Sequence, residues 1–408
     1  MKGIEKSKKG KKSKKSLFSR INAWLHLWLG IFSGVILVFV ALTGTLVVYG
    51  DELIDWSAGS ARYVPEVAAE RLPMETLMTN VTAAYPRAKL SEVTVYKNPE
   101  RTVRFRAFSK ESGLAFAYVN PYNGAVLKYD NTGNFFFVMA HLHASFLWHG
   151  PGTWIVDIAT IIFLIELISG IILWWPKKWT KKTREDSFKI RWKARFKRVN
   201  YDLHNVLGFY SSLLALILTV TGLIIAFKPV FESTARIFGG DIQTPWQKQL
   251  PKPDPATAQG QKPYPLNQAI DAAFTEHPLQ TMAQVWVYNI PKEGFYTVFT
   301  GSNFGLKSSE NAKINFYDKI SGKALFIPEK SLRGEYVENY VWQLHMGTWM
   351  GQIGKFFTFL CGLICTTLPI TGFLIWWHRG RKKKKKAGRN PKHPPKNRQP
   401  EEQRMELA

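Results

Sequence analysis

The strongest constraint in this sequence is a stretch that occurs twice, first at Arg20 to Tyr49 and again at Arg198 to Phe227. The two copies align without a gap. The residues that they share at one fixed offset are Arg20, Asn22, Leu25, His26, Leu29, Gly30, Thr43 and Gly44, matched by Arg198, Asn200, Leu203, His204, Leu207, Gly208, Thr221 and Gly222. Recurrence at a fixed offset is the signature of a repeated structural unit.

A second pair of segments repeats in the same way around His143 and His345. The matched steps are Leu142-His143, Ser169-Gly170 and Trp174-Trp175 in the first half, and Leu344-His345, Thr371-Gly372 and Trp376-Trp377 in the second. The chain is therefore predicted to be a tandem duplication, in which each half contributes one histidine from each pattern.

Four apolar runs accompany these repeats, at residues 26-49, 154-175, 204-227 and 355-377. Each is long enough to cross a bilayer, because a span needs about 20 residues that rise about 1.5 Å each. The predicted fold class is a mainly α membrane protein, with four transmembrane helices in a pseudo-twofold tandem repeat and two small α+β domains outside the membrane.

Basic residues predict the orientation of these spans. Lys and Arg outnumber Asp and Glu by 9 to 1 in residues 1-23, by 11 to 3 in residues 176-203 and by 12 to 3 in residues 378-408. The two long loops are balanced, with 10 against 10 in residues 51-140 and 12 against 11 in residues 228-345. Since positive residues stay on the cytoplasmic side, both termini are predicted to be cytoplasmic and both long loops to face outward.

The two long loops repeat as well. Residues 73-127 and 265-325 each have the pattern of one helix followed by three alternating strands and a turn. The helices are predicted at 73-85 and 265-274, and the strands at 91-96, 102-108, 114-120, 284-289, 295-300 and 312-318. Each loop is thus expected to form its own α+β domain, and the Pro- and Gln-rich residues 245-265 to form a linker.

These patterns divide the chain into nine predicted segments. They are a basic disordered arm (1-19), the first span (20-50), the first outer domain (51-133), an interfacial helix with the second span (134-176), a basic loop (177-199), the third span (200-228), the linker with the second outer domain (229-335), an interfacial helix with the fourth span (336-378) and a basic disordered tail (379-408). The arm directly precedes a span, which favours binding to anionic lipid over nucleic acid.

Histidines are the residues whose spacing indicates chemistry, because the sequence has no P-loop, dinucleotide fingerprint or nucleophile elbow. Two parallel halves imply a pseudo-twofold axis along the membrane normal. That axis would place His26 opposite His204 at the inner face, and His143 opposite His345 at the outer face. Two facing imidazoles per level predict two non-covalent b-type haems with bis-histidine ligation, whereas zinc would require three or four ligands per level.

Residues near the inner histidines support a haem. Gly30 and Gly208 lie one helical turn after His26 and His204, where a missing side chain would let a flat macrocycle approach the backbone. Three polar residues are predicted to meet the haem propionates, namely Arg20, Arg198 and Asn200.

For several residues the sequence allows more than one role. His141 and His149 are alternatives to His143 as the outer ligand, although a solvated position is the preferred interpretation for both. Asp157 and Glu166 lie in the second span and have Phe359 and Leu368 as counterparts. For Asp157 a position at the membrane rim is preferred, and for Glu166 a functional and a structural role are equally compatible with the sequence.

These motifs together resemble the PepSY-associated transmembrane helix family over residues 18-380. The features in question are L-H-x-x-L-G with a later T-G, L-H-x-S before G-P-G, Q-L-H-x-G before the last span, and S/T-G followed by W-W. The resemblance implies two PepSY-like periplasmic domains, a bacterial inner membrane, and two b haems on His26/His204 and His143/His345.

The family includes di-haem reductases of ferric siderophores, so the implied activity is outward electron transfer and reduction of a ferric siderophore at the haem held by His143 and His345. The chain carries no flavin or NAD(P)H motif, and a separate donor, either a quinol or a cytoplasmic reductase, is expected. Two alternatives are a general di-haem electron carrier with another acceptor and a haem-free regulator of proteases or peptide-binding module. The sequence names no siderophore, donor, redox potential or oligomeric state.

Overall fold

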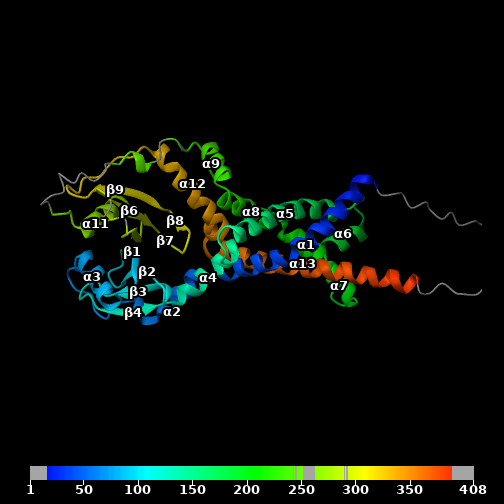
Figure 1. Cartoon of the computed structure of the whole chain (residues 1–408), viewed down its shortest axis with the longest axis horizontal. Helices are drawn as coiled ribbons and strands as arrows, with labels where there is room; N and C mark the ends of the chain where they lie inside the picture. Colours follow the sequence, from blue (N-terminus) through cyan, green and yellow to red (C-terminus); the bar gives the residue numbers. More distant parts are fainter. Residues whose placement is uncertain are drawn as a thin grey trace, which may run out of the picture.

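The computed structural model describes residues 16–241, 243, 246–250, 262–288, 290 and 293–387. The molecule is elongated, with a helical bundle at one end and a sheet at the other (Figure 1). The arm predicted to bind lipid, part of the predicted linker and most of the basic tail lie outside the described residues.

Four helices are long and apolar enough to cross a membrane among the described residues, which confirms the four predicted spans. They cover Leu17–Val47, Pro151–Trp174, Phe196–Ala226 and Thr348–Arg379. The first two are α1 (Leu17–Val47) and α5 (Pro151–Trp174). The third is built from α7 (Phe196–Asp202), the π-helical η2 (Leu203–Leu207) and α8 (Gly208–Ala226), and the fourth is mainly α13 (Gly351–Ala387).

Helix α13 continues to Ala387, beyond the predicted start of the disordered tail at residue 379. Lys and Arg have a high intrinsic preference for the helical conformation. The basic run therefore extends the helix past the apolar span.

The bundle has an apolar exterior and small or polar side chains inside. Phe32 and Leu213 are 75% and 71% exposed, as expected for side chains that face lipid. Ala215, Cys361 and Cys365 are buried at the centre, and both cysteines are free thiols that pack as small residues. Small residues allow helix backbones to approach closely, which is how membrane helices associate.

The sheet joins strands from both long loops. Its order is β4-β3-β2-β1-β5-β6-β9, and every neighbouring pair is antiparallel. The first loop supplies β1 (Lys89–Tyr96), β2 (Val103–Ser109), β3 (Gly113–Val119) and β4 (Val126–Asp130), and the second supplies β5 (Met282–Val285), β6 (Phe295–Gly301) and β9 (Lys313–Asp318). The predicted strands are present, with β4 in addition, and the strand expected at 284-289 ends at Val285.

The two outer units, which were expected to be separate domains, share one core. Strand β1 pairs with β5, with Val93 opposite Val285. Helices α3 (Met74–Ala84) and α11 (Leu266–Glu276) pack against the same set of buried residues. The Asn267 side chain hydrogen-bonds Leu72 O and Met74 N, which links the two helices directly. Small units bury little apolar surface alone, so the shared sheet compensates for their size.

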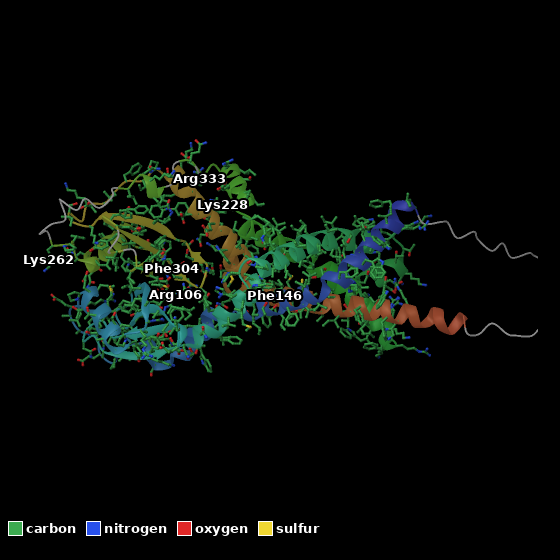
Figure 2. All side chains as sticks on the ribbon, viewed as in Figure 1. Arg106, Phe146, Lys228, Lys262, Phe304 and Arg333 are labelled. Carbon is green, nitrogen blue, oxygen red and sulfur yellow. The ribbon has the colours of Figure 1, made fainter. Side chains whose placement is uncertain are left out.

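Short elements connect sheet and bundle. They are α2 (Gly50–Ala58), η1 (Gly59–Arg62), α4 (Thr132–Ser145), α9 (Lys228–Ile237), α12 (Glu329–Met346), η4 (Thr348–Met350) and the hairpin of β7 (Asn303–Phe304) and β8 (Ser309–Glu310). Helix α6 (Lys181–Phe188) lies at the opposite end of the bundle, and η3 (Trp246–Lys248) packs beside the sheet. Phe146 marks the junction of bundle and sheet, with Arg106 and Phe304 on the sheet side (Figure 2).

Candidate functional site

The bundle brings His26 of α1 and His204 of η2 together at its end away from the sheet. Their ring centroids are 6.4 Å apart. His26 Nδ1 lies 2.9 Å from Ser169 Oγ, and His204 Nδ1 lies 3.0 Å from Thr371 Oγ1. We call these two histidines the remote pair.

A second pair forms at the end of the bundle next to the sheet. His143 of α4 and His345 of α12 have ring centroids 6.0 Å apart. His143 Nδ1 lies 2.8 Å from the Val40 carbonyl oxygen, and His345 Nδ1 lies 3.0 Å from Thr221 Oγ1. We call these two histidines the sheet-side pair. In each pair the two histidines are thus neighbours in space. The sequence analysis expected this arrangement for the ligands of two haems.

The hydrogen bonds define which ring nitrogen is available. The hydroxyls of Ser169, Thr371 and Thr221 donate to backbone carbonyls of their own helices, so they accept from the histidine Nδ1–H groups. His143 donates to a carbonyl, which is an acceptor only. Within the described residues the four Nε2 atoms form no hydrogen bond. An outer partner on one nitrogen fixes the tautomer that leaves the other free to bind a metal.

The spacing of both pairs fits one metal ion between two rings. Metal bonds to imidazole nitrogen are about 2 Å long, so two rings that coordinate from opposite sides have centroids about 6 Å apart. No group of three or more His, Cys, Asp or Glu side chains suited to a metal occurs in the described part of the chain. Two protein ligands suit an ion whose other positions are already filled, as the iron of haem is.

A cavity of about 430 Å³ surrounds the remote pair. Cofactor sites commonly enclose about 300–1,000 Å³. The walls are mostly apolar and aromatic, with polar side chains at a few positions, and include Gly30, Gly208, Phe163, Trp174, Tyr201, Asn205, Phe209, Trp376 and Arg379. The cavity therefore has the size and lining of a cofactor site, and both predicted glycines lie in its wall.

Four Ser/Thr-Gly steps receive the four histidines, a role that the sequence analysis missed. A Cβ on Gly44 would lie 2.8 Å from the His143 ring. The corresponding distances from Gly170 to His26, from Gly222 to His345 and from Gly372 to His204 are 3.2, 3.3 and 3.2 Å. Each step thus makes room for an imidazole from a neighbouring helix. The signal was available, because all four steps belong to the repeated patterns.

Gly30 and Gly208 also make room for side chains of neighbouring helices. A Cβ on Gly30 would lie 3.2 Å from Glu166 Oε2, and one on Gly208 would lie 3.6 Å from Leu368. Each glycine thus faces a side chain of the adjacent helix as well as the cavity.

The predicted propionate partners are not among the residues that line the cavity. Asn200 is buried and donates to the Thr371 carbonyl at 3.0 Å. Arg198 forms ion pairs with Asp186 at 2.7 Å and Asp202 at 2.8 Å. These two side chains support the helices, and Arg20 also lies outside the lining. The cation in the cavity wall is Arg379.

The two alternative histidines lie apart from the sheet-side pair. His141 donates its Nδ1–H to the Phe137 carbonyl oxygen at 2.8 Å, and its ring centroid is 5.9 Å from that of His149. Residues two apart on a helix point in nearly opposite directions, and His143 is the one that faces His345.

Asp157 is buried in the first turns of α5.

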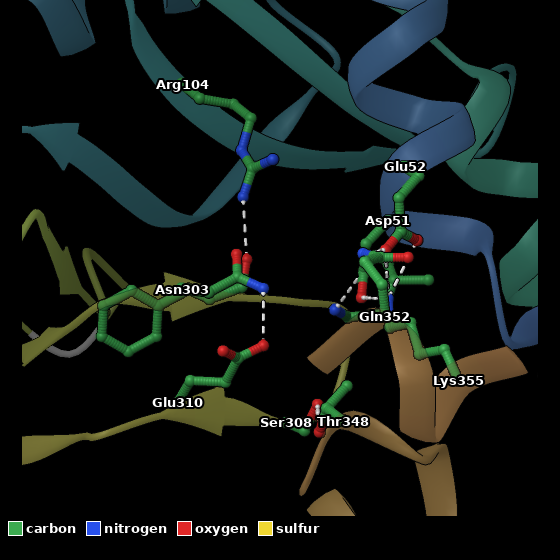
Figure 3. A network of polar contacts seen from close by, with 11 residues as sticks. Asp51, Glu52, Arg104, Asn303, Ser308, Glu310, Thr348, Gln352 and Lys355 are labelled. Atoms are coloured by element: carbon green, nitrogen blue, oxygen red, sulfur yellow. Dashed lines mark hydrogen bonds and ion pairs between the residues drawn. The ribbon is translucent and has the colours of Figure 1, made fainter. Parts of the chain in front are cut away.

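A charged network joins Lys355 of α13 to Asp51 and Glu52 of α2 (Figure 3). Lys355 is 2% exposed, and its Nζ lies 2.7 Å from Glu52 Oε1 and 3.6 Å from Asp51 Oδ2. Burial raises the pKa of Asp51 although Lys355 opposes it. For Glu52, the hydrogen bonds from Lys355 and Gln352 outweigh burial and lower the pKa.

Four apolar helices that enclose facing histidine pairs, with a sheet region attached at one end, define a multi-pass membrane protein. The sequence profile of the PepSY-associated TM region matches residues 23–379, and the chain therefore belongs to that family. A search of curated proteins finds no match.

Proposed function

We propose that this protein is a bacterial inner-membrane di-haem b reductase, which moves electrons from the cytoplasmic side to the periplasm and reduces ferric siderophores there. The observation that carries the proposal is the state of the four histidines: in each facing pair both Nδ1 atoms are hydrogen-bonded and both Nε2 atoms remain available. The haems would supply one-electron chemistry at two levels of the bundle.

The residues around the histidines hold and orient the ligands in this proposal. The Ser/Thr-Gly steps fix the rotation of each imidazole, and the apolar walls exclude water from the remote cavity. Arg379 and Asn205 supply polar groups for haem propionates at the remote pair. His143 and His345 would hold the haem that faces the acceptor.

Charge supports the orientation. At the end of the bundle away from the sheet, the spans are flanked in the sequence by the basic segments 1-23, 176-203 and 378-408. Because positive residues are retained in the cytoplasm, that end is assigned to the cytoplasmic side and the sheet to the periplasm. The basic arm is assigned to anionic lipid on the same ground, and the donor to a separate protein or quinol.

Residues next to the sheet-side pair suggest where an acceptor docks. The Trp342 ring lies edge-on to His345, with centroids 6.2 Å apart. The exposed Lys307 places its Nζ 5.6 Å from the centre of the Trp342 ring. A cation and an aromatic surface this close to the histidines suit an anionic ferric chelate.

The test is a visible spectrum of the detergent-purified protein, oxidised and dithionite-reduced, with a pyridine haemochrome assay to count haem. Two b haems per chain are expected. His26→Ala with His204→Ala, and separately His143→Ala with His345→Ala, should each remove one haem, and the second double variant should abolish reduction of ferric chelates. A colourless protein from haem-replete cells would contradict the proposal and favour a haem-free binding module. Two haems that reduce other acceptors but no ferric chelate would favour a general carrier.

A further inference from the structure

One of the four histidines has a carboxylate partner. Glu166 Oε2 on α5 lies 3.0 Å from His26 Nδ1, next to the Ser169 hydroxyl at 2.9 Å. Glu166 is only 8% exposed, and its Oε1 is buried without a hydrogen bond among the described residues. His26 is therefore the main polar partner that this carboxylate has in the protein.

The matching position in the second half lacks this group. Leu368 occupies the position that corresponds to Glu166, and His204 Nδ1 contacts the Leu368 carbonyl at 3.1 Å and the Thr371 hydroxyl at 3.0 Å. His143 and His345 likewise contact only carbonyl and hydroxyl oxygens through Nδ1. Of the four histidines, His26 alone therefore has a carboxylate oxygen close to its Nδ1, at 3.0 Å.

The space for Glu166 is provided by Gly30. A Cβ at residue 30 would lie 3.2 Å from Glu166 Oε2, which is closer than most real contacts of a Cβ. The glycine thus lets the carboxylate reach His26 across the interface of α1 and α5. The matching Gly208 leaves an ordinary contact distance of 3.6 Å to Leu368. The first half of the repeat therefore provides space for the Glu166 carboxylate next to Gly30.

We infer that Glu166 is a positioning residue that shares the His26 Nδ1–H with the Ser169 hydroxyl and makes His26 a stronger electron donor than the other three histidines. The inference rests on the proposed function. A carboxylate behind a metal-bound imidazole fixes the ring and raises the basicity of the ligand. Stronger donation stabilises an oxidised metal, so a haem held by the remote pair would have a lower reduction potential than one held by two histidines without a carboxylate partner.

The experiment is a potentiometric titration of the purified full-length protein, followed by visible spectra, for wild type and Glu166→Gln. Glutamine keeps the shape and removes the charge. Glu166→Gln is expected to retain two haems, to raise one midpoint potential and to leave the other unchanged. The low-spin electron paramagnetic resonance signal of the same haem should shift, because that signal reports the strength of the axial ligands.

Leu368→Gln is the matched control, since it introduces the same neutral side chain at the corresponding position. Its effect on the midpoint potential is expected to be smaller than that of Glu166→Gln. Equal shifts in the two variants, or two retained haems with unchanged potentials in Glu166→Gln, would overturn the inference and leave the proposed function intact. A wild-type protein without haem would overturn both.

A second variant tests the inference in case Glu166→Gln does not retain the haem of the remote pair. Gly30→Ala keeps the carboxylate but displaces it from His26 by a few tenths of an ångström. A rise of the same midpoint potential in Gly30→Ala supports the inference, and an unchanged potential overturns it.

Discussion

At the scale of single residues, the Ser/Thr-Gly steps explain how a crowded bundle accommodates imidazole rings. A glycine weakens a helix by about 1 kcal/mol relative to alanine. The glycine of each Ser/Thr-Gly step, one per span, is therefore expected to have a contact that compensates for this loss. That contact is a histidine from the neighbouring helix, 2.8 to 3.3 Å from the missing Cβ. The hydroxyl that precedes three of these glycines then accepts the Nδ1–H bond.

Gly44→Ala tests this arrangement. The new Cβ would lie 2.8 Å from His143, so the ring must move. We expect the haem of the sheet-side pair to be lost or weakly bound while the other is retained, as counted by the pyridine haemochrome assay. Gly334→Ala is the control, because nothing lies within 4 Å of its Cβ in α12. Full haem content in Gly44→Ala would contradict the role given to the glycine.

Asp130 sets a pH dependence at the junction of β4 and α4. Burial alone would raise its pKa, but hydrogen bonds from Thr132, Lys128 and Ser57 outweigh burial and lower the pKa to about 2 from 3.8. A lowered folded-state pKa stabilises the protein above the unfolded pKa. This stability is fully present above about pH 5 and is lost as the pH falls through the range between 3.8 and about 2.

Asp130→Asn is therefore expected to lower the free energy of unfolding by about 2 kcal/mol at neutral pH. The difference from wild type should shrink toward zero as the pH approaches the lower value. Thermal unfolding midpoints of both proteins, measured at several pH values, check this. A difference that stays constant with pH would mean that the carboxylate charge is not responsible.

At the scale of elements, η2 distinguishes the two halves. His204 lies in a π-helical turn, whereas His26 lies in the regular helix α1. A π-turn inserts an extra residue into the helical winding and often occurs at functional sites. Here it contributes to the orientation of His204 toward His26, although the sequence repeat is gapless.

Lys355 connects α13 to α2 and is expected to stabilise the junction of bundle and sheet. Lys355→Met would leave Asp51 and Glu52 without their cation, at a cost of about 3 kcal/mol. The measurement is the midpoint of thermal unfolding in detergent.

Two comparisons control for this result. Adding Glu52→Gln to Lys355→Met should recover part of the loss, because one uncompensated charge is removed. Lys228→Met breaks an exposed ion pair with Glu232 at 3.8 Å and should cost less than about 1 kcal/mol. A similar small cost for Lys355→Met would show that the network contributes little to the junction.

At the scale of the whole molecule, the single sheet makes the two halves of the outer region one cooperative unit. Val93 of β1 and Val285 of β5 are opposite each other in the central strand pair and are both buried. Val93→Ala removes two buried methyl groups, at a cost of about 2 kcal/mol. Hydrogen exchange should then accelerate in β6 and β9 as well as in β2 and β3. Unchanged protection of β6 and β9 would indicate that the halves unfold independently.

Elements that depend on a local residue pattern could be predicted from the sequence. Apolar runs identified the four spans, alternation identified most strands, and the gapless repeats singled out the histidines that the fold brings together as pairs. These features could be predicted because span length and strand period are encoded in neighbouring residues.

Three features depend on how distant segments pack. The tertiary structure joined the two outer units through β1 and β5, it turned Arg198 and Asn200 away from the cavity, and it placed Glu166 against His26. Each depends on the relative position of segments more than 100 residues apart or on competition between neighbouring partners. Sequence periodicity describes one element at a time, whereas these contacts arise from the way in which separate elements pack.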